Sequence, residues 1–156
     1  MNLVSRLMPS AQPTFAAAQP RDAAAIARLH AASFGRGWEE DEVHRLLLDS
    51  PVVAHRAMVR RTMVGFIMSR MAADEAEILS VAIAPARRGR GFSRPLLDFH
   101  LRSLAALGAR AVFLEVDERN APACRLYGGA AFYEVGRRQG YYAGRATALV
   151  LRRDLG

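Results

Sequence analysis

The sequence predicts a mixed α/β protein whose sheet is mostly antiparallel and contains one parallel pair of strands. Short stretches of alternating or continuous apolar residues predict strands, and longer stretches with apolar residues three and four positions apart predict helices. In the second half, one helical stretch lies between two strand-like stretches, which implies a parallel pair. The 156 residues, 51% of them apolar, are enough to bury one hydrophobic core.

The first half of the chain predicts a short strand, two helices and three further strands. Asp22, which follows Pro20, is placed to cap the first helix. The acidic residues at the start of the second helix interact favourably with the positive end of its dipole. On the first helix we expect Ile26, Leu29 and Phe34 to face the core. The expected ranges are, in chain order, 14–18, 23–34, 38–48, 52–59, 63–71 and 76–83.

The second half begins with a basic loop that contains glycine, RRGRGFSR, directly before a leucine-rich helix. Gly108 is the expected C-cap of this helix, because glycine readily adopts the left-handed conformation that ends helices. A buried strand, a short helix and two last strands follow. The expected ranges of these five elements are 96–108, 111–117, 120–128, 131–137 and 146–152.

The composition argues against several classes of protein. No apolar run reaches the roughly 18 to 20 residues of a membrane span, and Arg6 interrupts what would be the apolar part of a secretory signal. We therefore expect a cytoplasmic protein with a flexible leader at 1–12 and one domain at 13–156. Cys124 is the only cysteine, and the four histidines lack metal-binding spacing, so neither a disulfide nor a metal site is expected.

Positive charge is concentrated in the second half of the chain. Residues 1–85 hold 9 Arg and 9 acidic residues, whereas residues 86–156 hold 13 Arg and 6 acidic residues and carry the whole formal charge of +7. All 22 basic residues are Arg, whose planar guanidinium suits phosphate. The second half is therefore expected to attract a polyanion, either nucleic acid or a phosphorylated cofactor.

The RRGRGFS loop before the leucine-rich helix is the first candidate site. Gly89 and Gly91 allow backbone N–H groups to converge on an anion, and the helix that follows adds the positive end of its dipole. Arg88, Arg90 and Arg94 add charge. The pattern is neither the Rossmann nor the P-loop fingerprint. The alternative is a surface turn whose arginines are simply solvated.

Glu115 and Tyr127 are the other candidates for chemistry. A carboxylate inside the apolar strand AVFLEVD is costly to bury without a partner, and such a group suits a general base. The alternative is a glutamate that faces water or an Arg partner. Tyr127 ends the segment NAPACRLY, where a phenol can be an ordinary packing residue or a part of the site. Taken singly, each residue leaves both readings open.

In their order and spacing, these segments resemble the GNAT acetyltransferases, and specifically the RimI-type ribosomal-protein N-terminal alanine acetyltransferases. Residues 88–93, RGRGFS, are similar to the acyl-CoA motif Q/R-x-x-G-x-G/A, with Ser93 in place of its last small residue. The segment LEVDERNAPACRLY resembles LEVR-x-x-N-x-x-A-x-x-LY, and FYEVGRRQGYY resembles F-x-x-x-G-x-R-x-x-YY. Residues 34–38 resemble the Phe and Trp loop that precedes the second helix of this family.

The resemblance implies the GNAT fold, in which six or seven strands contain a splayed central parallel pair and about four helices flank the sheet. It also implies acetyl-CoA as cosubstrate, with Glu115 as general base and Tyr127 as general acid. The residues expected to bind acetyl-CoA are Val81, Ala82, Ile83, Arg88, Gly89, Arg90, Gly91, Phe92, Ser93, Arg94 and Asn120. The residues expected to bind the acceptor are Phe34, Trp38, Tyr141 and Tyr142.

The function expected from the resemblance is transfer of acetyl to the N-terminal α-amine of a protein, with alanine of a small-subunit ribosomal protein as the expected acceptor. A small amine or a lysine side chain is the alternative acceptor. A different class of function is a module without catalysis, which binds RNA or the ribosome through its basic half or senses acyl-CoA. The sequence contains no RNP-like, KH or helix-turn-helix signature, so no specific nucleic-acid partner is expected. No membrane partner is expected either.

Overall fold

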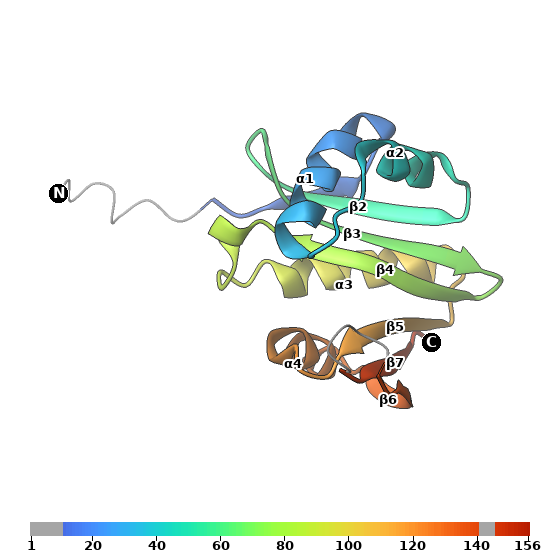
Figure 1. Cartoon of the computed structure of the whole chain (residues 1–156). Helices are drawn as coiled ribbons and strands as arrows, with labels where there is room; N and C mark the ends of the chain where they lie inside the picture. The colour runs from blue at the N-terminus through green and yellow to red at the C-terminus, as the bar shows by residue number, and fades with distance from the viewer. Residues whose placement is uncertain (1–10, 141–145) are drawn as a thin grey trace.

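The structure, a computed structural model, describes residues 11–140 and 146–156, and a seven-stranded sheet forms its centre (Figure 1). The strands are β1 (Thr14–Ala17), β2 (Val52–Val59), β3 (Thr62–Ala72), β4 (Glu75–Ile83), β5 (Ala111–Asp117), β6 (Tyr133–Arg138) and β7 (Ala148–Asp154). The helices are α1 (Ala23–Ser33), α2 (Glu40–Leu48), α3 (Ser93–Ala106) and α4 (Ala121–Gly129), with short 3-10 turns at Pro20–Asp22 and Pro85–Arg87.

The strands are ordered β1-β2-β3-β4-β5-β7-β6, and every neighbouring pair is antiparallel except β4 and β5. This arrangement follows from the chain. Short turns join β2, β3 and β4 in consecutive order, α1 and α2 lie between β1 and β2, and α3 crosses between β4 and β5 and brings them in parallel. The mostly antiparallel sheet with one parallel pair confirms the predicted fold class.

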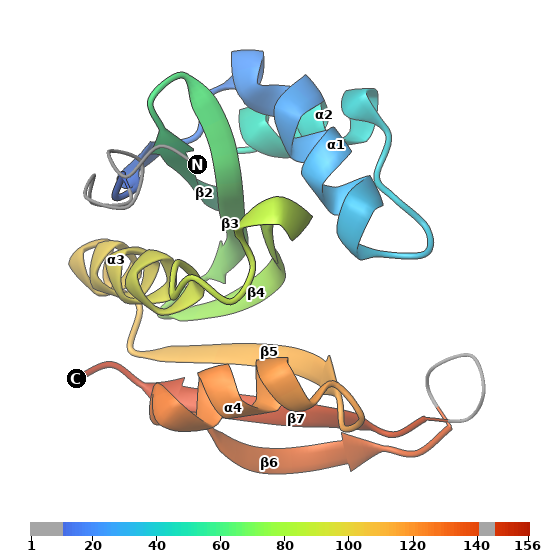
Figure 2. The same ribbon diagram turned by 90° about the vertical axis from the view of Figure 1, so that its left-hand side faces the viewer.

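Helices cover both faces of the sheet and create two apolar cores (Figure 2). The apolar run in β3 explains how one strand serves both cores. Phe66 and Met68 pack in the core under α1 and α2, whereas Ile67 packs in the core under α3 and α4. All three side chains are fully buried, as alternation along a strand covered on both faces requires.

The parallel pair is joined over only part of its length. β4 and β5 pair at Glu75–Ala111, Ala76–Val112 and Glu77–Phe113, and no later residue of either strand is paired with the other. Next to this point, the register between β3 and β4 shifts at the Met68/Ser69 position of β3, so that Leu79 is the extra residue of a β-bulge. The two strands therefore diverge toward their carboxyl ends, as the splayed pair of the resemblance predicts.

Two details of the first helix differ from the prediction. Asp22 occupies the N-cap position of α1, but its carboxylate makes no capping hydrogen bond there. It accepts instead from the backbone N–H of Gln19 at 2.7 Å and from Arg56 at 2.8 Å, so it closes the preceding 3-10 turn and ties it to β2. Phe34 was expected in the core but is 43% exposed, because α1 ends at Ser33 and the chain turns away.

The strand β6 also starts later than predicted. Ala131 adopts a left-handed conformation with φ 66°, and the N–H of Phe132 donates to the carbonyl of Tyr127 at 3.0 Å. These two features close the end of α4, so residues 131 and 132 belong to the helix terminus and cannot start the ladder with β7. The ranges of β2 and β5 agree with the prediction in full.

A polar cluster lies inside the core between β2, β3 and α3. The Nδ1 atoms of His55 and His100 are 2.7 Å apart, and the Oγ of Ser69 lies 2.6 Å from the Nε2 of His100. His55 is 7% exposed and the other two are fully buried. Burial lowers the pKa of His55 and lowers that of His100 to about 3. One ring nitrogen of the His–His contact must donate and the other must accept, which the neutral forms allow.

Across the described ranges, none of the helices combines the length and the apolar character that crossing a bilayer requires.

Candidate active site

The RGRGF loop, residues 88–92, presents its backbone to solvent at Gly89 and Gly91. Gly89 and Gly91 have φ values of 75° and 76°, a left-handed conformation that favours glycine. No atom lies within 4 Å of where a Cβ would stand on either residue. The fourteen-residue helix α3 begins at Ser93, and no side chain caps its first turn. The open N–H groups and the helix dipole together suit an anion such as pyrophosphate.

Two of the three arginines expected to add charge to this loop are bonded elsewhere. Arg88 donates to the Oγ of Ser33 at 2.9 Å and to the carbonyl of Ile83 at 3.2 Å. Arg94 donates to Asp98 at 3.0 Å and to the carbonyl of Gly129 at 2.8 Å. The first arginine therefore ties the loop to α1 and β4, and the second ties α3 to the end of α4.

The other loop residues divide by exposure. Arg90 is exposed and has no hydrogen bond or ion pair with any described residue. Phe92 is 5% exposed and packs in the core under α3, so only its backbone is available to a ligand. Ser93 is the first residue of α3, with its N–H among the unpaired donors of the first helical turn.

The edge of β4 that faces β5 is open beyond Glu77, because the parallel pairing stops there. Val81, Ala82 and Ile83 lie on this open stretch, where an extended ligand can add to the strand by backbone hydrogen bonds. Ser80, at the bulge, is 7% exposed, and its hydroxyl has no hydrogen-bond partner in the described part of the chain. A buried hydroxyl without a partner is costly unless a ligand or water satisfies it.

Glu115 lies on β5, just beyond the last residue paired with β4. Leu114 and Val116 on either side of it pack in the core with α3 and α4. Because successive side chains of a strand point to opposite faces, Glu115 points to the other face of the sheet. Its side chain is 23% exposed and its carboxylate lies 3.2 Å from Arg138 of β6. Glu115 therefore lies within an apolar strand and also has an Arg partner, so the features of both interpretations of the sequence are present together.

Tyr127 lies on the opposite face of the sheet from Glu115. It comes from α4, packs in the same core as Leu114 and stacks edge-on against Phe132 at 5.5 Å between ring centres. The residue is 5% exposed, and burial raises the pKa of its phenol to about 12. The hydroxyl is therefore protonated at neutral pH. Glu115 and Tyr127 can therefore act on the same reacting bond only if that bond lies in the opening between β4 and β5, with one group on each side.

Asn120 stands immediately before α4 and caps it. Its Oδ1 accepts from the backbone N–H of Ala123 at 3.2 Å, which satisfies one of the unpaired donors at the helix start. Asn120 was expected inside the helix. Its side-chain amide nitrogen makes no hydrogen bond within the described residues, and its contact with a cofactor stays a prediction.

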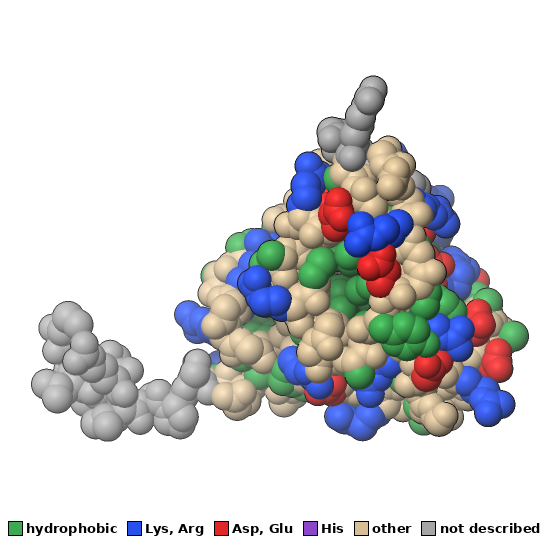
Figure 3. All heavy atoms as spheres, turned by 90° about the horizontal axis from the view of Figure 1, so that it is seen from below, with side chains coloured by type: hydrophobic (Ala, Val, Ile, Leu, Met, Phe, Trp, Pro, Cys, Tyr) green, Lys and Arg blue, Asp and Glu red, His purple; other side chains and the backbone are tan. Residues whose placement is uncertain are grey.

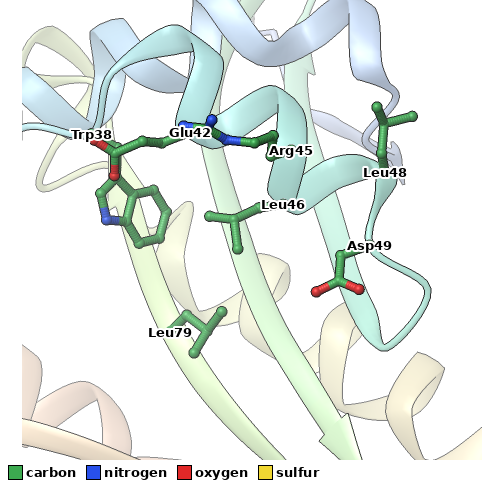
Figure 4. A pocket seen from close by; sticks show the side chains of 7 residues that line it. All are labelled: Trp38, Glu42, Arg45, Leu46, Leu48, Asp49 and Leu79. Atoms are coloured by element: carbon green, nitrogen blue, oxygen red, sulfur yellow. The ribbon is translucent and has the colours of Figure 1, made fainter.

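An open groove of about 680 Å³ runs between α2 and β4 on the same face as Glu115 (Figure 4). Trp38 borders it where α2 begins, Leu46 of α2 and Leu79 of β4 line its apolar part, and Glu42 adds a carboxylate. Leu79 and Glu115 each lie two residues beyond the last pair of β4 and β5, so the groove reaches the level of Glu115.

The position of Trp38 depends on a histidine that the sequence analysis did not select. The indole stacks on the ring of His30, with ring centres 4.1 Å apart, and the backbone N–H of Trp38 donates to the Nδ1 of His30 at 2.9 Å. The ring of Phe34 also packs against the His30 ring, with ring centres 4.5 Å apart. Tyr141 and Tyr142, the other two predicted acceptor residues, lie outside the described residues.

Other residues of the site were missed because they lack a motif. His30, Ser33, Glu42 and Leu79 come from three elements and meet only in the folded chain. The spacing of His30 and Ser33, three residues apart at the end of a predicted helix, could have indicated a shared face toward the following loop. Nothing in the sequence around Leu79 indicates that it borders a groove.

Ion pairs involve five arginines in the described part of the basic second half. Seen from below, Arg side chains alternate with acidic ones around exposed apolar groups (Figure 3). The arginines of this half that pair with Asp or Glu are Arg94, Arg119, Arg137, Arg138 and Arg152. This face therefore carries a mixed surface, and a continuous cationic track of the kind that nucleic acid favours does not lie on it.

Comparison with known proteins agrees with the geometry. The solved structure of the ribosomal-protein-S18-alanine N-acetyltransferase from Escherichia coli has a TM-score of 0.87 with this chain at 23% sequence identity, and covers 92% of this chain and 94% of that one. That likeness establishes the fold.

Two curated relatives are both named [Ribosomal protein bS18]-alanine N-acetyltransferase. The protein from Escherichia coli (strain K12) is 32% identical over 92 residues, or 57% of this chain and 62% of the relative. The protein from Haemophilus influenzae is 36% identical over 92 residues, or 56% of this chain and 62% of the relative. The match therefore spans just under two thirds of the length of either relative.

A family model described as the acetyltransferase (GNAT) family matches residues 23–132, which include α1, the RGRGF loop, Glu115 and Tyr127. This match covers well over half of the chain. The chain therefore belongs to the acetyltransferase (GNAT) family.

Proposed function

We propose that the protein is an acetyl-CoA-dependent N-acetyltransferase that acts on the N-terminal α-amine of a protein, with alanine of a small-subunit ribosomal protein as the acceptor. The observation that carries the proposal is the opening between β4 and β5, which has a carboxylate on one face and a protonated phenol on the other. Family membership supports acetyl transfer, and the names of the two curated relatives support this acceptor.

The residues around the opening fit acetyl-CoA. The RGRGF loop offers backbone donors and a helix N-terminus to pyrophosphate, and the open edge of β4 at 81–83 offers backbone groups to the pantetheine arm. The unpartnered hydroxyl of Ser80 lies on the same strand and would be satisfied by a polar group of this arm. When bound, acetyl-CoA supplies an activated thioester carbonyl for attack by an amine.

Glu115 is the group that prepares the acceptor. An α-amine has a pKa of about 8, so most of it carries a proton at neutral pH and is no nucleophile until that proton leaves. Glu115 accepts the proton, directly or through a water molecule, on the face where the α2 groove brings the acceptor chain. The ion pair with Arg138 holds the carboxylate in place.

Backbone and Tyr127 complete the transfer on the other side of the opening. As the amine nitrogen bonds to the carbonyl carbon, negative charge grows on the carbonyl oxygen, and an N–H of the open β4 edge stabilises it. The carbon–sulfur bond then breaks. Tyr127 donates its proton to the departing thiolate, and its high pKa ensures that the proton is present at neutral pH.

The proposal is tested by offering the protein acetyl-CoA with short peptides that begin with Ala, Ser, Met or Gly, together with spermidine and free lysine. Mass spectrometry identifies which acceptor gains one acetyl group. We expect peptides to be preferred over small amines, because a peptide chain can extend from Glu115 into the groove, and we expect the Ala peptide to be acetylated first, as in the names of the two curated relatives. Acetylation of only the small amines would contradict the proposed acceptor, and the absence of transfer with acetyl-CoA bound would indicate a sensor.

Glu115→Gln is the variant that tests the base, because it keeps the shape and removes the proton acceptor. We expect kcat to fall by about 10² to 10³-fold, as loss of a general base does. Glu118→Gln is the matched control, since Glu118 lies three residues further along and pairs with Arg137 at the surface. Equal loss in both variants would contradict the role of Glu115.

A further inference from the structure

Arg88 is the first residue of the RGRGF loop, yet its side chain does not point along the loop toward an anion. Its Nε donates to the carbonyl of Ile83, the last residue of β4, at 3.2 Å, and its Nη2 donates to the Oγ of Ser33, the last residue of α1, at 2.9 Å. A guanidinium presents several donors in one rigid plane, so it can hold two acceptors on different elements at a fixed separation. Arg88 thus joins three pieces of chain.

Ser33 lies at the start of the segment 34–39 that leads into the acceptor groove. One helical turn earlier, His30 holds the far end of the same segment through its stack with Trp38 and the hydrogen bond from the Trp38 N–H. Trp38 itself borders the groove. Contacts therefore run without interruption from the RGRGF loop through Arg88 and the end of α1 to the groove wall.

We propose that Arg88 is a positioning residue that ties the RGRGF loop to the segment 34–39, so that acetyl-CoA binding raises the affinity for the acceptor. This inference rests on the proposed function. A bound pyrophosphate fixes the backbone of the loop, which fixes the guanidinium and hence Ser33 and the end of α1. An acceptor that enters afterwards loses less conformational freedom in ordering Trp38. By thermodynamic reciprocity, the acceptor raises the affinity for acetyl-CoA by the same factor.

Trp38 provides a direct readout because it is the only tryptophan of the chain. Its fluorescence quenching by acrylamide is measured with and without acetyl-CoA, and calorimetry gives the dissociation constants of acetyl-CoA and of a non-acetylatable peptide that begins with N,N-dimethylated alanine, a tertiary amine that forms no stable amide. In the wild type we expect acetyl-CoA to shield Trp38 and to tighten peptide binding about fivefold.

Ser33→Ala and Arg88→Lys break the link in two ways. The first removes the hydroxyl that accepts the hydrogen bond from Arg88, and the second keeps the positive charge but loses the planar guanidinium. Both are expected to lose the shielding and most of the fivefold coupling, and Ser33→Ala is expected to bind acetyl-CoA within about twofold of the wild type. Arg87→Lys is the matched control, because Arg87 precedes Arg88 and its side chain makes no bond with a described residue. Melting temperatures confirm that each variant folds.

Two results would overturn the link. If Arg88→Lys weakens acetyl-CoA binding tenfold while Ser33→Ala changes nothing, Arg88 is a phosphate ligand and not a bridge. If all variants keep the full coupling, the path through Ser33 carries none of it. If acetyl-CoA shields Trp38 in the wild type but not in Ser33→Ala, and no peptide is acetylated, the link is supported and only the proposed acceptor fails.

Discussion

The two faces of the split sheet are built in different ways. On the face of α3 and α4, the groups that serve the site are enclosed, and Tyr127 is only 5% exposed. On the face of α1 and α2, the groups that serve the site are open to solvent. The side chain of Glu115 is 23% exposed and Phe34 is 43% exposed, and the groove on this face is open. This difference between a closed and an open side is what the proposed function predicts for a site that holds one constant cosubstrate and admits a polypeptide.

Tyr127→Phe tests the enclosed side most directly and has the largest expected effect. Phenylalanine keeps the packing against Phe132 but cannot protonate the thiolate. We expect kcat to fall by about 10² to 10³-fold with little change in either KM. Because burial raises the pKa of Tyr127 to about 12, the wild type should show no loss of kcat from this group below about pH 10.

Tyr133→Phe is the matched control for that prediction. Tyr133 is a half-exposed tyrosine of β6 whose hydroxyl donates to Asp154 at 2.8 Å, away from the opening. Steady-state rates over a pH series decide between the two. If Tyr127→Phe keeps the wild-type kcat, the proton for the thiolate comes from elsewhere and the enclosed face has only a structural role.

The histidine cluster makes the enclosed face sensitive to acid. Burial lowers the pKa of His55 and lowers that of His100 to about 3, whereas an unfolded chain binds these protons near pH 6.5. Below pH 6.5 the unfolded state therefore holds more protons than the folded state, and the free energy of unfolding falls as pH decreases toward 3. The expected slope is about 1.4 kcal/mol per pH unit for each histidine that stays neutral in the folded state.

Urea unfolding between pH 7 and pH 4 measures this slope. His55→Asn should reduce the slope by about the contribution of one histidine. The fold should be kept, because asparagine can still bond to His100. His44→Asn is the control, because His44 lies exposed on α2 outside the cluster. A wild-type stability that does not change between pH 6.5 and pH 4 would contradict the assignment of neutral, buried rings.

The contrast between the faces also explains what the sequence could predict. Gly89 and Gly91 stand in one short segment that shapes its own backbone, so the loop and the helix after it were predictable from local residues. The core position of Phe34 was predicted from helical periodicity alone and is wrong, because the helix ends one residue earlier. Trp38 and Leu79 line one groove only when distant helices and strands pack, and no local pattern encodes that arrangement.

Gly91→Ala separates backbone shape from charge in the RGRGF loop, which is open to solvent at the start of α3. An alanine at φ 76° is strained by roughly 1 to 2 kcal/mol, so the loop is expected to relax away from the geometry that suits pyrophosphate. We expect the dissociation constant of acetyl-CoA to rise about tenfold while acceptor binding to the free protein is unchanged. Gly128→Ala is the control, because Gly128 has a helical backbone and open space around it. Equal affinities in both variants would indicate that the loop does not contact the cosubstrate.

Leu79→Ala has the smallest expected effect and probes the open side. Leu79 is only partly buried, so its truncation removes part of an apolar contact with the acceptor, about 1 kcal/mol or about fivefold in the acceptor KM. Acetyl-CoA should bind as before, since its expected contacts are with the backbone of β4. Leu107→Ala, at an exposed site beyond α3, should change neither constant. A rise in the KM of acetyl-CoA instead would mean that the two sides of the opening share this residue, and the division between a closed cosubstrate side and an open acceptor side would not hold at β4.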